Sequence, residues 1–201
     1  GIGQIEGVTV GLIGIRRAPL SAEGFRTVVR LYRLAGQLEF PIISLIDSPG
    51  VAQASAIEGA ALSNAIAQAM RVAVSLPVPT VSVVTGVASG PGAMALTIAD
   101  RVYMLEHALF STNGLERPTH PGLASATQSG FWGARECLRL GLVDGVIPEP
   151  TGGAQADPEG AAQQLRLTII HALAELNGVG QRRLLDERMR KLRHLGLSTP
   201  A

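Results

Sequence analysis

A predicted strand, a glycine-rich turn and a predicted helix follow one another directly between residues 79 and 99. The first part is rich in valine, residues 85–92 carry three glycines, and the last part consists mainly of small and apolar residues. A junction of this kind aims several backbone N–H groups at one point, where an anion or a developing oxyanion is stabilised. The junction therefore indicates a site for a reacting carbonyl, a site for a phosphate, or only a tight turn.

Around this junction the chain alternates between short apolar runs and amphipathic runs. Continuous apolar runs such as residues 41–46 indicate strands that are covered on both faces, and apolar residues spaced three and four apart indicate helices. We expect strands at residues 8–13, 41–46, 78–84, 101–105, 108–111 and 143–147, a turn at 47–50, helices at 21–38, 56–76, 93–99, 131–140, 158–176 and 181–195, and a long loop at 113–130. This alternation is typical of the α/β class.

Composition limits the possible functions. A chain of 201 residues with 46% hydrophobic residues can bury one sizeable core, so we expect a single domain over residues 1–201. A net charge of +1 and an aromatic content of 3% argue against a nucleic-acid partner. Pro77 and Pro79 interrupt the longest apolar stretch, which argues against a membrane partner. Cys137 is the only cysteine, so we expect no disulfide, no metal and a reducing, cytoplasmic setting.

The start of the sequence is also informative. It lacks an initiator methionine and begins almost inside a strand. We therefore expect that the chain is a fragment or a processed product.

Several motifs resemble, in order along the chain, the acetyl-CoA carboxylase carboxyltransferase alpha subunit. The run FPIISLIDSPGV at residues 40–51 is similar to a strand and turn of that family that end in D-T-P-G-A. Further similar segments are GFR at 24–26 with RL at 30–31, ADRVYMLE at 99–106, GLVDGVIPEPTGGA at 141–154, and the closing helix around residues 184–196. The string IPEPTGGA at residues 147–154 is the most specific of these matches.

The resemblance implies a crotonase-like (ClpP/crotonase) fold, built from stacked ββα units with C-terminal helices. It implies a carboxyltransferase component that moves a carboxyl group from carboxybiotin to an acyl-CoA. The implied partners are a beta-type carboxyltransferase subunit, which carries the other half of the active site, and a biotin carboxyl carrier protein. The implied cofactor is the biotin of that carrier, the substrate is an acyl-CoA, and the assembly is a hetero-oligomer.

The resemblance also assigns site residues. Backbone groups of Gly90, Pro91 and Gly92 would hold the ureido oxygen of biotin, as an oxyanion site does. The family has a Gly–Gly pair where this chain has Pro91 and Gly92, and proline has no N–H to donate. Either the neighbouring glycines carry the site, or the junction is a purely structural turn.

A second group of residues would line the substrate channel. Its members are small or β-branched, so that a ligand can approach the backbone, although close packing of strand and helix explains the same residue types. They are Gly50, Val51, Gly86, Val87, Ala88 and Ser89.

Three other functions stay open at this point. Ser89 resembles the nucleophile of ClpP-like serine peptidases, which needs a base within hydrogen-bond reach. The only lysine, Lys191, lies in the last helix and is an improbable base, so His107 or His120 would have to serve. The chain also fits a biotin-independent malonyl-thioester decarboxylase subunit or a non-catalytic scaffold subunit. The arginines of residues 182–193 predict an amphipathic helix with a solvated basic face, or contacts to CoA phosphates or a partner.

Two segments depart from the family pattern. Arg16 and Arg17 keep the positive charge of the corresponding family segment but none of its other residues. Residues 111–122 also differ from the family, in a region that borders the reaction site. We therefore expect a substrate preference that differs from acetyl-CoA.

Overall fold

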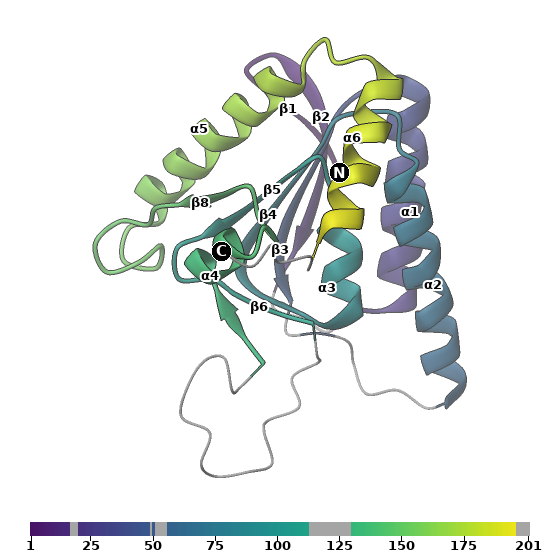
Figure 1. Cartoon of the computed structure of the whole chain (residues 1–201), viewed down its shortest axis with the longest axis horizontal. Helices are drawn as coiled ribbons and strands as arrows, with labels where there is room; N and C mark the ends of the chain where they lie inside the picture. Colours follow the sequence, from purple (N-terminus) through teal and green to yellow (C-terminus); the bar gives the residue numbers. More distant parts are fainter. Residues whose placement is uncertain (17–19, 49, 51–55, 113–129, 196–201) are drawn as a thin grey trace.

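An eight-stranded sheet forms the centre of the molecule (Figure 1). The computed structural model describes residues 1–16, 20–48, 50, 56–112 and 130–195. The main sheet order is β1-β2-β3-β4-β5-β8, with β6 paired to the end of β4 and β7 paired to β6. The strands are β1 (Ile2–Ile5), β2 (Val8–Ile15), β3 (Ile42–Ser48), β4 (Thr80–Ser89), β5 (Arg101–Leu105), β6 (Leu109–Ser111), β7 (Trp132–Gly133) and β8 (Gly145–Ile147). All pairings are parallel except β1 with β2 and β6 with β7.

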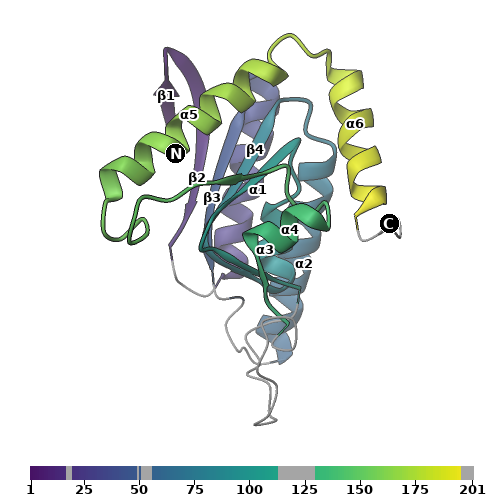
Figure 2. The ribbon, with the colours of Figure 1, turned by 60° about the vertical axis from the view of Figure 1, so that its left-hand side comes forward.

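Helices cover both faces of this sheet. They are α1 (Ala22–Leu38), α2 (Ala56–Val74), α3 (Gly90–Leu96), α4 (Ala134–Arg139), α5 (Pro158–Leu176) and α6 (Gln181–His194). Figures 1 and 2 show α1, α2 and α3 on one face and α5 across the other. Because each helix between parallel strands begins beyond the carboxyl end of a strand, the starts of α1, α2 and α3 lie along one edge of the sheet. That edge contains the predicted junction.

Local sequence explains where these elements begin and what they bury. The Ser21 hydroxyl accepts a hydrogen bond from the backbone N–H of Gly24 at 3.1 Å and so caps α1. Phe25, Val28 and Tyr32 then follow at helical spacing and are buried against the sheet. The central strands β3 and β4 are buried on both faces, as their continuous apolar runs predict.

Several predicted boundaries are wrong. An additional strand, β1, forms a hairpin with β2 through Glu6 and Gly7, which both have positive φ angles. Asp47 and Ser48 belong to β3 and not to a turn. Residues 131–133 are not helical, because Trp132 pairs with Phe110 in the short strand β7 and Gly133 is the N-cap of α4.

The basic face predicted for the last helix is also partly wrong. Arg188 is 1% exposed and lies on the inner side of α6. Its guanidinium donates to both carboxylate oxygens of Asp100, at 2.9 and 2.7 Å, and to three backbone carbonyls near the end of α2. Lys191 forms an ion pair with Asp144 on the same side. Both charges therefore attach α6 to the sheet.

Within the described ranges, every helix is too short or too polar to cross a bilayer.

Candidate functional site

The first feature of the predicted site is a bulge in β4. Ile46 of β3 pairs with Val84, but Ser48, only two residues later, pairs with Ala88, so β4 contains two extra residues here. Asp47 stands opposite the bulge, and its Oδ1 accepts a hydrogen bond from the N–H of Val87 at 3.0 Å. Bulges of this kind frequently lie beside active sites, because they re-aim the residues that follow.

The bulge explains Gly86. A Cβ built at this position would lie 2.4 Å from the Asp47 Oδ1, so any side chain would displace the carboxylate. The sequence analysis placed the start of a turn at this point, and this prediction is wrong because β4 continues to Ser89. Close packing, the other explanation given for the small residues of this segment, therefore explains why residue 86 is glycine.

The second feature is the strand–helix junction, which follows the bulge in the chain, where β4 ends and α3 starts. Ser89 is the N-cap of α3, and Gly90 has a φ of 72°, a conformation that favours glycine. Gly90 and Gly92 are buried, whereas Pro91 is exposed. The N–H groups of a first helical turn have no partner within the helix. The junction thus offers two buried N–H groups, with Pro91 between them donating none.

The end of β3 lies beside this junction. Gly50 has a φ of 122°, and a Cβ built on it would lie 3.7 Å from the Ser89 carbonyl oxygen. The N–H of Gly50 donates to the Ser48 hydroxyl at 3.3 Å, so a local turn already uses this N–H. The structure therefore places Gly50 beside Ser89, the residue that precedes Gly90. Val51 lies outside the described residues.

Three buried serines stand at the same edge of the sheet. Ser48, Ser89 and Ser111 end the neighbouring strands β3, β4 and β6, and each is at most 1% exposed. Ser89 and Ser111 are register partners. The ends of these strands therefore place three buried serines near the junction. The sequence analysis identified Ser89 but not the other two, since only the register places them together.

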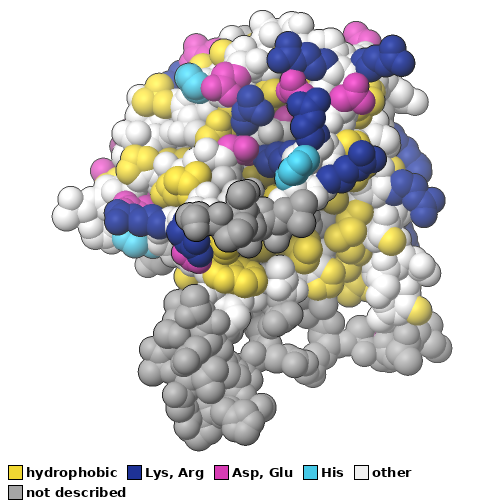
Figure 3. Space-filling model, in the orientation of Figure 1, with side chains coloured by type: hydrophobic (Ala, Val, Ile, Leu, Met, Phe, Trp, Pro, Cys, Tyr) yellow, Lys and Arg dark blue, Asp and Glu magenta, His cyan; other side chains and the backbone are white. Residues whose placement is uncertain are grey.

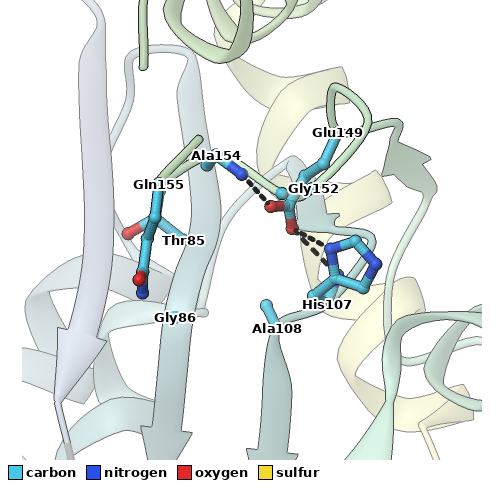
Figure 4. A pocket seen from close by; sticks show the side chains of 9 residues that line it. Thr85, Gly86, His107, Ala108, Glu149, Gly152, Ala154 and Gln155 are labelled. Carbon is cyan, nitrogen blue, oxygen red and sulfur yellow. Dashed lines mark hydrogen bonds and ion pairs between the residues drawn. The ribbon is translucent and has the colours of Figure 1, made fainter. Parts of the chain in front are cut away.

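A pocket of about 490 Å³ lies on the other side of the bulge (Figure 4). Gly86 and Thr85 form one wall, and the opposite walls come from the β5–β6 turn and the loop after β8. Its lining residues are Thr85, Gly86, His107, Ala108, Glu149, Gly152, Gly153, Ala154 and Gln155. Val87 and Ala88 separate Gly86, at the pocket, from Ser89, at the junction. Among the described residues predicted to line a substrate channel, only Gly86 lines this pocket, and the sequence does not predict its other walls.

Glu149 holds two walls of the pocket together. Its side chain is 6% exposed, and its carboxylate accepts hydrogen bonds from the N–H of His107 at 2.9 Å and the N–H of Ala154 at 2.7 Å. The His107 Nδ1 lies 3.3 Å from the same carboxylate. Although burial raises the pKa of Glu149, these hydrogen bonds outweigh it and lower that pKa below its ordinary value. This arrangement gives the IPEPTGGA string a physical role.

The geometry bears on a nucleophilic role for Ser89. The His107 ring contacts Glu149 at the pocket, and His107 precedes Ser111, the register partner of Ser89, by four residues. His120, the other candidate base, lies outside the described residues. Within the described residues, the best candidate base for Ser89, the His107 ring, thus contacts Glu149.

Among the residues that the structure describes, the His, Cys, Asp and Glu side chains form no group of three or more that could hold a metal ion.

The sequence is similar to a known family over most of its length. Residues 18–196 match the family described as acetyl co-enzyme A carboxylase carboxyltransferase-like. The chain is 35% identical to the acetyl-coenzyme A carboxylase carboxyl transferase subunits beta/alpha of Parafrankia sp. (strain EAN1pec), covering 100% of this chain and 36% of that protein. It is 35% identical to the corresponding subunit alpha of Idiomarina loihiensis, covering 98% and 67%. The chain therefore spans only part of the length of these relatives.

Solved structures with low sequence identity share the fold. The Pseudomonas malonate decarboxylase hetero-dimer matches with a TM-score of 0.74 at 16% identity, covering 96% of this chain and 87% of that chain. An enoyl-CoA hydratase from Mycobacterium smegmatis matches with a TM-score of 0.66 at 15% identity, covering 98% and 84%. These likenesses confirm the predicted crotonase-like fold.

Proposed function

The chain belongs to the acetyl-coenzyme A carboxylase carboxyltransferase family, and from this premise we propose that it is an alpha-type component that transfers a carboxyl group between carboxybiotin and an acyl-CoA. The observation that carries the proposal is the pair of buried N–H groups at Gly90 and Gly92, which start α3 beside the bulge. The lone buried thiol, Cys137, supports a reducing, cytoplasmic location.

We propose that the site is completed by a beta-type subunit. The names of relatives that combine beta and alpha subunits in one protein support this partner. Exposed apolar side chains also surround the junction: Met94 of α3 is 37% exposed, Leu109 of β6 is 39% exposed and Leu138 of α4 is 44% exposed. Figure 3 shows hydrophobic side chains over α3 on this side of the molecule. Contiguous exposed apolar surface is typical of a protein interface.

The mechanism that we propose depends on backbone donors. Carboxybiotin, delivered by a biotin carboxyl carrier protein, supplies the carboxyl group. The Gly90 and Gly92 N–H groups donate hydrogen bonds to the ureido oxygen of biotin and stabilise the negative charge that develops there. The left-handed Gly90 sets the direction of these donors, and the Asp47–Val87 hydrogen bond fixes the strand that leads to them. Gly86, Val87, Ala88 and Gly50 line the approach.

The pocket beside Gly86 supports the channel that we assign to the acyl-CoA. It opens on the same strand as the junction and has walls of small residues. Gly152 and Gly153 both have positive φ angles and no side chains, so backbone atoms alone form this part of the wall opposite Gly86. A ligand can therefore approach the backbone on both sides.

Carboxyl transfer tests this function directly. The chain would be purified together with a beta-type subunit, and transfer from malonyl-CoA to free biotin would be measured. We expect transfer only when both chains are present. The Gly90→Ala variant should slow the transfer on the order of 10²-fold, because it displaces the donors of the anion site.

A matched glycine controls for backbone strain. Gly141, which follows α4, has a φ of 68°, close to the 72° of Gly90. Gly141→Ala carries the same strain, about 1–2 kcal/mol, away from the junction and should leave the transfer rate nearly unchanged. Equal losses in both variants would contradict the assignment of the donors. Rapid decarboxylation of malonyl-CoA without biotin, with no transfer, would instead indicate a decarboxylase subunit.

A further inference from the structure

Four arginines line one seam between α1 and α2. Arg26, Arg30 and Arg33 follow one another at intervals of four and three residues, so they share a face of α1. Arg71 faces them from α2. We call these four residues the arginine groove. All four side chains belong to exposed residues.

The arginine groove is a continuous hollow. Two adjacent cavities of about 370 and 520 Å³ share Arg26 and Gln68 along the seam. The first also contains Arg30 and Arg33, and the second also contains Arg71 and the amide of Asn64. The guanidinium and amide groups therefore surround one elongated surface depression.

The charges of this groove are uncompensated. Several arginines elsewhere in the described residues form ion pairs, such as Arg101 with Glu175 and Arg135 with Glu106. Within the same described ranges, the four groove arginines form none, and Arg30 donates a hydrogen bond only to the Thr27 hydroxyl.

The net charge of the groove also differs from that of the rest of the chain. Among the described residues that line it, Glu23 is the only acidic one, so the four arginines and Glu23 sum to +3. The whole chain sums to +1, which leaves −2 for all other residues. The groove is therefore a local concentration of positive charge on the outer side of α1 and α2.

The shape of the groove selects among anions. From Arg26 to Arg33 the helix rises roughly 10 Å, at ~1.5 Å per residue, which is longer than a single phosphate. The lining contains arginine, amide, alanine and valine side chains but no aromatic ring on which a nucleotide base could stack. Guanidinium groups bind carboxylates in a bidentate manner.

We propose that the arginine groove is a docking surface for an acidic segment of a partner protein, whose Asp and Glu side chains pair with Arg26, Arg30, Arg33 and Arg71. The amides of Asn64 and Gln68 hydrogen-bond the same segment. The groove lies on the outer side of α1 and α2, so this docking does not depend on the carboxyl-transfer function. Because the charges are exposed, the association weakens as salt increases.

Binding of a fluorescein-labelled oligoglutamate peptide to the full chain tests the proposal by fluorescence anisotropy at several salt concentrations. Replacing Arg26, Arg30 and Arg33 by glutamine should weaken binding roughly tenfold, whereas the corresponding Arg→Lys variant should keep most of it, since the charge remains. Arg71→Gln should weaken binding from the α2 side. Unchanged circular dichroism and thermal unfolding would verify that the variants fold.

A set of arginines on α6 provides the matched control. Arg182, Arg190 and Arg193 are exposed and lack an ion pair in the described part of the chain, so their replacement by glutamine removes the same charge elsewhere. We expect the peptide to bind this variant about as well as the unchanged chain. Equal losses in both triple variants would show unspecific attraction and overturn the proposal. Displacement of the peptide by triphosphate or coenzyme A at far lower concentration than by unlabelled peptide would indicate a phosphate site instead.

Discussion

Pro91 is the residue at which the chain departs most from an anion-binding junction. It is exposed and lies between two buried glycines in the first turn of α3. Alanine and glycine at this position both restore an N–H. We expect Pro91→Ala and Pro91→Gly to raise the carboxyl-transfer rate by similar factors, about tenfold for one added hydrogen bond to a developing charge. Steady-state kinetics with the beta-type partner would measure this increase.

The comparison of the two variants separates chemistry from flexibility. An added donor is common to both substitutions, whereas added backbone freedom belongs to glycine alone. An increase in Pro91→Gly only would show that the junction needs flexibility. No change in either variant would show that the third N–H does not reach the reacting oxygen, and it would favour a scaffold role for the chain.

At the level of single residues, the sequence predicts features that depend on residue type. It does not predict contacts between residues that lie far apart in the chain. The Gly50–Ser89–Gly90 cluster is predictable, because glycine and small residues mark the ends of buried strands. The contact of Asp47 with the bulge is not, since it depends on a register shift between two strands. Arg188 is missed for the same reason: its partner, Asp100, lies 88 residues earlier in the chain.

The last helix depends on that buried pair. Arg188 joins α6 to Asp100, and Asp100 also accepts hydrogen bonds from the N–H and hydroxyl of Thr80, both at 2.8 Å. Removing the arginine leaves a buried carboxylate without its counter-charge. We expect Arg188→Met to lower the free energy of unfolding by about 3–5 kcal/mol, as measured in urea.

Two further variants make this prediction specific. Arg190→Met removes an exposed arginine from the same helix and should change stability by at most about 0.5 kcal/mol. The double variant Arg188→Met with Asp100→Asn should recover part of the loss, because no charge stays buried. A loss below about 1 kcal/mol for Arg188→Met would contradict a role for the ion pair in holding α6.

A second element-level connection is sensitive to acid. The Glu149 carboxylate joins the β5–β6 turn to the loop after β8, and its hydrogen bonds hold its pKa below the ordinary value of 4.5. A carboxyl group with a lowered pKa stabilises the fold fully above its unfolded pKa. This contribution is lost as the pH falls through the lower, folded value. Stability should therefore decrease on acidification over this range.

The Glu149→Gln variant tests the acid dependence. At pH 7 we expect a loss of about 1–3 kcal/mol, since one backbone N–H meets an amide NH₂ in place of a carboxylate oxygen. The pH dependence of unfolding in urea should also become shallower below the ordinary pKa. Glu159→Gln, at the exposed start of α5, is a control that should retain the original acid dependence. An identical pH profile for Glu149→Gln would show that another group titrates there.

The elements themselves were largely predictable, because each is built from local periodicity. The predicted bounds of α5 are correct, and those of α1 and β5 differ from the structure by at most one residue. The errors lie where pairing overrides propensity, as in β7, which forms because Trp132 meets Phe110. Extension of β4 to Ser89 likewise depends on its pairing with β6, which no local pattern reveals.

At the scale of the whole molecule, the two faces differ in the surface they expose. Met94, Leu109 and Leu138 are exposed on α3, β6 and α4, whereas α5 covers the other face of the sheet and exposes Leu167 to 50%. An interface with the beta-type subunit on the junction side would bury the first group and leave Leu167 in solvent. The surface that binds the partner can therefore be located by introducing a charged residue at one position on each of these two surfaces.

We expect Leu138→Asp to weaken the association with the beta-type subunit on the order of tenfold or more, because burying an unpaired carboxylate costs several times the thermal energy. Met94→Asp, at the outer surface of α3, should have the same direction of effect. Leu167→Asp introduces the same charge on α5 and should leave the affinity unchanged. Biolayer interferometry with the immobilised beta-type subunit would measure all three variants. A loss of affinity in Leu167→Asp, with none in Leu138→Asp, would place the interface on α5 and separate the junction from the partner.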